Sequence, residues 1–65
     1  MKTFFVYQNW TTEKLYKSGL TEMAAYYAAA ELDSLIKNGH GNGCACVGNI
    51  ADESDYHVAK RLGLI

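Results

Sequence analysis

The hydrophobic positions between residues 20 and 47 predict one long helix, a loop and a strand. Thr21 is a good N-cap residue, and apolar residues then recur three and four positions apart. The helix is expected to end near Asn38, because a glycine-rich loop begins at Gly39. We therefore predict a helix over about residues 22–38, with these residues on its apolar face: Ala24, Ala25, Ala28, Ala29, Leu32, Leu35 and Ile36.

Two segments before the helix have the composition of β-strands. Residues 3–8 are rich in aromatic and β-branched side chains and predict a first strand. Residues 13–17 fit either a second strand or a short helix that ends before Gly19. We favour the strand, because residues 9–12 then form a hairpin turn and a sheet of three strands is more stable than one of two.

The last third of the chain predicts a third strand and a second helix. Residues 44–50 form the strand, and the acidic and hydroxyl side chains of residues 51–54 suit a helix N-terminus. A short helix over about residues 54–62 would end at Gly63. The expected fold is a single α+β domain over residues 1–65, with the order β-β-α-β-α and a three-stranded, mostly antiparallel sheet packed by both helices. The pattern does not determine which strand is central.

Size and charge narrow the classes of function. A core of 65 residues rarely supplies more than about 3–5 kcal/mol of stability without a metal, a disulfide or a partner chain. The net charge of −1, with lysines scattered among acids, argues against binding to nucleic acid. No apolar run approaches the ~20 residues of a membrane span, and no signal peptide is recognisable. We expect a cytoplasmic protein in which both cysteines are free thiols.

The residue types that bind zinc occur at His40, Cys44, Cys46 and His57. A Cys-x-Cys pair on a strand directs both sulfurs to the same face of the sheet. Structural zinc sites usually separate paired cysteines by two to four residues, however, and cysteine is a common core residue. We expect the thiols to pack under the alanine face of the long helix, with no metal and no cofactor. A small zinc-stabilised module is the alternative.

The sequence offers no arrangement of residues that favours catalysis. Neither cysteine has a cationic neighbour that would stabilise a thiolate nucleophile. The glycine-rich loop at residues 39–43 follows a helix, whereas a phosphate-binding loop precedes one. We therefore expect a protein that is not an enzyme.

Aromatic residues provide the strongest indication of function. One tryptophan and five tyrosines are too many for so small a core to enclose, and these residue types are enriched at protein-binding hot spots. Met23, Tyr26 and Tyr27 fall outside the apolar face of the long helix. We predict a binding surface made of five residues: Trp10, Tyr16, Met23, Tyr26 and Tyr27.

The predicted function is that of a small intracellular interaction module, of adaptor or inhibitor type, that binds another protein. A phage- or bacterium-encoded inhibitor of a host enzyme fits the size and charge by analogy. In such an inhibitor, acidic side chains would imitate phosphate groups, and the candidates are Asp33, Asp52, Glu53 and Asp55. A homodimer is a further alternative, since an exposed apolar helix face suits a twofold interface.

Overall fold

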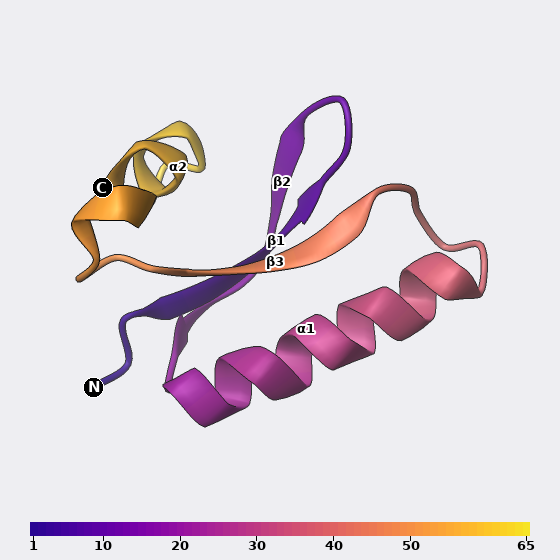
Figure 1. Ribbon diagram of the computed structural model, residues 1–65, viewed down its shortest axis with the longest axis horizontal. Coiled ribbons are helices and arrows are strands. Elements are labelled where there is room, and N and C mark those ends of the chain that lie inside the picture. Colours follow the sequence, from indigo (N-terminus) through magenta and orange to yellow (C-terminus); the bar gives the residue numbers. More distant parts are fainter.

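The computed structural model describes residues 1–65 and has the predicted order β-β-α-β-α (Figure 1). The strands are β1 (Phe4–Asn9), β2 (Glu13–Leu20) and β3 (Cys44–Asn49). The helices are α1 (Glu22–Lys37) and α2 (Tyr56–Arg61), the second preceded by a 3₁₀ turn, η1 (Glu53–Asp55). The sheet is antiparallel throughout, in the order β2-β1-β3. The predicted α+β fold is confirmed, residues 13–17 belong to a strand, and β1 is central.

Helix α1 packs its small residues against one face of the sheet. The Thr21 hydroxyl caps the helix by accepting a hydrogen bond from the backbone N–H of Ala24 at 3.2 Å. Ala25, Ala28 and Leu32 are buried and form a core cluster with Val6 of β1. Alanine side chains let the helix backbone approach the sheet closely, so that little space remains between the two layers.

The opposite face of the sheet, which we call the back face, carries α2 (Figure 1). Phe5 and Ala59 are fully buried. The Phe5 ring fills the space in front of Gly48, where an added Cβ would lie 2.3 Å from its Cζ atom. Arg61 of α2 donates two hydrogen bonds to the Glu13 carboxylate, at 2.5 Å from Nε and 2.9 Å from Nη2, and so ties α2 to β2.

Both edges of the sheet are protected against the addition of another strand. The pairing of β2 with β1 is interrupted by two register shifts, and bulges of this kind distort a sheet edge. On β3, the Asp33 carboxylate accepts a hydrogen bond from Ala45 N at 3.3 Å, and Asp55 accepts one from Asn49 N at 3.0 Å. The register directs these two N–H groups away from β1, so the carboxylates occupy donors that an added strand would need.

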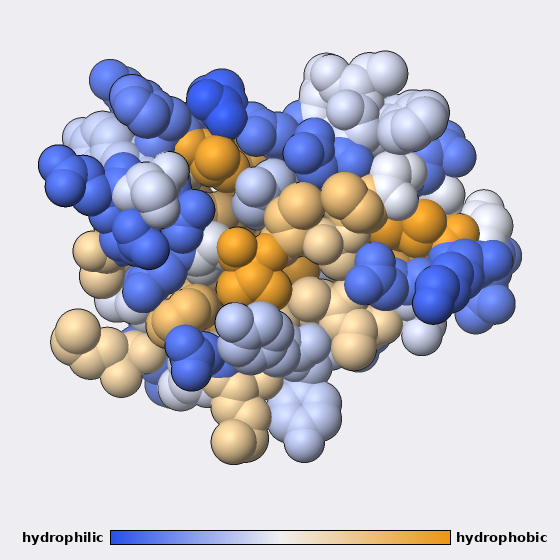
Figure 2. Space-filling model, viewed as in Figure 1, coloured by the Kyte–Doolittle hydropathy of each residue, from blue (hydrophilic) through white to orange (hydrophobic).

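Part of the surface next to the β3 edge is apolar. Ile36 of α1 and Val47 of β3 are only half-buried, although both pack against the core cluster. In the space-filling view, hydrophobic residues are visible in a band between β3 and α1, with hydrophilic residues at its margins (Figure 2). Leu35, which the sequence places on the apolar face, is 37% exposed and contributes little to the core.

Candidate protein-binding surface

The solvent side of α1 carries a second apolar stripe. Its members follow the spacing i, i+3, i+4, i+7, which places side chains on one side of a helix. This side lies opposite the one that packs against the sheet. We call these four residues the aromatic stripe: Met23, Tyr26, Tyr27 and Ala30.

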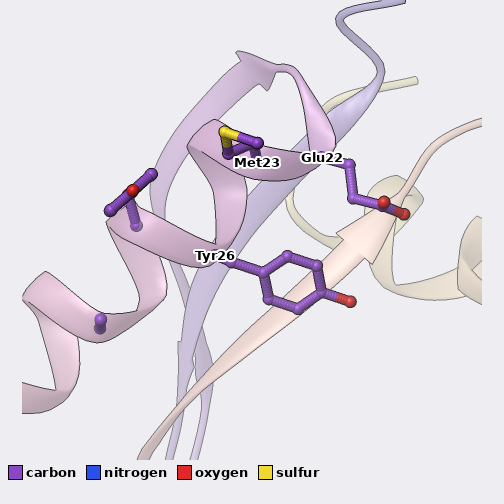
Figure 3. Close-up of a pocket in the computed structure, with 5 residues that line it drawn as sticks. Glu22, Met23 and Tyr26 are labelled. Carbon is purple, nitrogen blue, oxygen red and sulfur yellow. The ribbon is translucent and has the colours of Figure 1, made fainter.

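The aromatic stripe is open to solvent and hollowed at its centre. Met23 is 71% exposed, Tyr26 60% and Tyr27 73%, so the sequence correctly places all three outside the buried face. Together with Glu22 and Ala30 they line a shallow hollow of about 470 Å³ (Figure 3). Single exposed apolar residues are normal on a protein surface, but a contiguous group is typical of an interaction site.

Trp10 does not belong to this surface. It lies in the turn between β1 and β2 and is 63% exposed. Phe4 pairs with Leu20 next to the start of α1, whereas Asn9 pairs with Glu13 at the turn. Trp10 and the aromatic stripe therefore lie at opposite ends of the hairpin.

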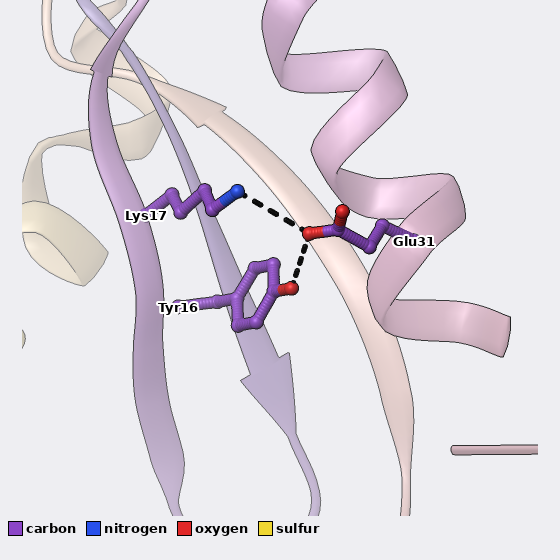
Figure 4. Close-up of polar contacts among 3 residues, drawn as sticks. All are labelled: Tyr16, Lys17 and Glu31. Atoms are coloured by element: carbon purple, nitrogen blue, oxygen red, sulfur yellow. Dashed lines mark hydrogen bonds and ion pairs between the residues drawn. The ribbon is translucent and has the colours of Figure 1, made fainter. Parts of the chain in front are cut away.

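Tyr16 faces α1 and forms part of the fold. Its hydroxyl donates a hydrogen bond to Glu31, and Lys17 Nζ lies 3.2 Å from the same carboxylate oxygen (Figure 4). The Tyr16 hydrogen bond, followed by the contact with Lys17, lowers the pKa of Glu31. Consecutive strand residues normally point to opposite faces. Here a register shift between the pairs Val6–Lys17 and Tyr7–Leu15 lets both neighbours reach Glu31.

The two cysteines lie on the back face, because Ala45 and Val47 occupy the positions that face α1. The prediction that the thiols pack under the alanine face is therefore wrong. Cys44 is exposed and Cys46 half-buried, with their Sγ atoms 3.8 Å apart. The chain brings no group of three or more His, Cys, Asp or Glu side chains together in a way that could hold a metal ion. The two histidines thus do not complete a site with the cysteines.

Two neighbouring side chains of the back face, Cys46 and Tyr7, have raised pKa values. Burial, followed by the neighbouring Cys44, raises the pKa of Cys46. Burial, followed by Cys46, raises the pKa of Tyr7 to about 12. A cysteine nucleophile needs the opposite shift, toward the thiolate.

Most of the acidic side chains suggested as phosphate mimics are used within the chain. Asp33 and Asp55 accept hydrogen bonds from β3, and Asp52 accepts one from Ser54 N at 3.0 Å. This hydrogen bond from the Ser54 backbone lowers the pKa of Asp52. The three carboxylates therefore contribute to edge protection and helix capping.

No protein-family model, curated protein or solved structure matches this chain. None of its helices combines the length and the apolar character needed to cross a bilayer. The exposed side chains of the aromatic stripe and their spacing make it the best candidate site.

Proposed function

We propose that this protein is a non-enzymatic interaction module, of adaptor or inhibitor type, whose aromatic stripe receives a helix of another protein. The observation that carries the proposal is that α1 is apolar on two opposite sides. One side is buried by the sheet, and the other holds Met23, Tyr26 and Tyr27 in water. Spacing of i, i+3, i+4, i+7 is the pattern by which helices dock on one another.

The charge around the hollow supports a partner helix with basic residues at its flanks. Glu22 is the one charged residue that lines it, and no basic side chain does. An apolar partner helix flanked by lysine or arginine would complement this charge. The tyrosine hydroxyls would remain at the rim, where they can hydrogen-bond to the partner or to water.

The arrangement of the sheet supports a helix as the occupant. A peptide that binds as an added strand needs a free sheet edge. The bulges of β2 obstruct this mode at one edge, and the carboxylates of Asp33 and Asp55 obstruct it at β3.

We place the function in the cytoplasm, a reducing compartment, because both cysteines are free thiols.

The test compares tyrosine-to-alanine variants at two places on the surface. The variant Tyr26→Ala/Tyr27→Ala removes the stripe, whereas Tyr56→Ala removes a tyrosine of α2 that is 50% exposed. Proteins captured by the wild type from cells of its source are identified, and the affinity of each purified candidate is measured. We expect the double variant to bind at least about 30-fold more weakly, as for truncated hot-spot residues, and Tyr56→Ala to bind normally. Equal affinity of the wild type and the double variant would refute the proposal.

Sedimentation at several protein concentrations tests the homodimer. If the wild type dimerises and Tyr26→Ala/Tyr27→Ala is monomeric, the occupant of the stripe is a second copy of this chain. That result would replace the adaptor or inhibitor by a self-associating module.

A further inference from the structure

The two thiols of β3 are arranged as one edge of a metal tetrahedron. Cys44 Sγ and Cys46 Sγ lie 3.8 Å apart on the same face of the strand. With a Zn–S distance of about 2.3 Å and tetrahedral angles, two thiolates on one zinc ion lie about 3.8 Å from each other. The distance between the two Sγ atoms already equals that between two thiolates bound to one zinc ion.

The pair is accessible from outside the molecule. Cys44 begins β3 and is exposed, while α2 follows the other end of this strand (Figure 1). Cys46 lies next to Tyr7, its pairing partner on β1. A metal ion bound here would therefore face solvent or another molecule on its outer side.

The chain supplies only half of a structural zinc site. Such sites have four protein ligands, and no third histidine, cysteine or carboxylate joins the two thiols. We propose that two copies of this chain bind one Zn²⁺ between them, with Cys44 and Cys46 of each copy as the four ligands. A twofold axis brings the same patch of both copies together, so one cysteine pair generates a complete tetrahedron.

The zinc site is independent of the proposed function, because it lies on the back face and the aromatic stripe lies on α1. Its test uses untagged, reduced protein and Zn²⁺ in competition with a chromophoric chelator. We expect one zinc ion per two chains, and a dimer in sedimentation that becomes a monomer when EDTA is added. Cobalt as a substitute for zinc should give the absorption bands of a tetrahedral tetrathiolate complex.

Single substitutions distinguish a site made of four cysteines from one that uses the histidines. Cys44→Ser and Cys46→Ser should each abolish zinc binding and zinc-dependent dimerisation. His40→Ala, His57→Ala and Tyr26→Ala/Tyr27→Ala should leave both unchanged. The proposal is overturned if the wild type does not compete for zinc, if one zinc binds per monomer, or if a histidine variant loses the metal. Circular dichroism of each serine variant in EDTA checks that it folds as the metal-free wild type does.

Discussion

Substituting alanine for Gly48 tests how the back face is packed. The added Cβ would lie 2.3 Å from Cζ of Phe5, and Phe5 is fully buried, so its ring cannot turn away into solvent. Overpacking of a core by one methyl group typically costs about 1–3 kcal/mol. For a chain of this size, each kcal/mol lowers the melting temperature by about 4–8 °C. We therefore expect Gly48→Ala to melt about 4–24 °C below the wild type in thermal denaturation followed by circular dichroism.

A double-mutant cycle identifies the cause of this loss. Phe5→Leu shortens the side chain and frees space, so Gly48→Ala should cost less in that background, with a coupling of about 0.5–3 kcal/mol. The matched control is Gly39→Ala, which meets no atom within 4 Å but has a φ of +84°. It should cost about 1–2 kcal/mol through backbone strain, and equally with Phe5 or Leu at position 5. A neutral Gly48→Ala, or one whose cost is unchanged by Phe5→Leu, would refute the packing described for the back face.

Three further predictions concern the core, the stability of the protein at acidic pH and the edge of the sheet. Leu32→Ala should cost about 2–5 kcal/mol and unfold much of the protein at 25 °C, whereas the partly exposed Leu35→Ala should cost clearly less in urea denaturation. Hydrogen bonds lower the pKa of Glu31, so at acidic pH this carboxylate binds fewer protons in the folded state than in the unfolded state. The stability of the folded protein should therefore fall as the pH drops below about 4.3. Glu31→Gln should show a shallower fall in melting temperature over this range. Asp33→Ala/Asp55→Ala should free two N–H groups of β3 and increase strand-mediated aggregation, measured by light scattering.

Elements with strong local signals were predicted almost residue by residue. Helix α1 starts and ends where the Thr21 cap and Gly39 indicate. Strand β2 runs on to Leu20, beyond the predicted end at residue 17, because Gly19 adopts a φ of +67° and the chain continues through a bulge. The central position of β1 depends on pairing between distant segments, and no local pattern carries that information.

Helix periodicity predicted only the part of the candidate site that lies on α1. Met23, Tyr26 and Tyr27 belong to one helix, so their shared exposure follows from their spacing alone. Trp10 and Tyr16 lie on the hairpin, where position depends on register and on partners such as Glu31. The cysteines show the same limit, since a strand predicts that both sulfurs share a face but not which face the helix covers.

The exposed residues of the aromatic stripe should be dispensable for folding, and this separates a binding role from a structural one. Glutamine and lysine favour helices at least as well as methionine and tyrosine do, and a lysine at position 26 would pair with Glu22 at i, i+4. The variant Met23→Gln/Tyr26→Lys/Tyr27→Gln should therefore keep the unfolding free energy of the wild type within about 0.5 kcal/mol in urea denaturation, as surface substitutions do. It should also lose the partner that the stripe binds. A loss of more than about 2 kcal/mol would mean that the three side chains support the fold, as buried residues do, and the argument for a docking surface on α1 would fail.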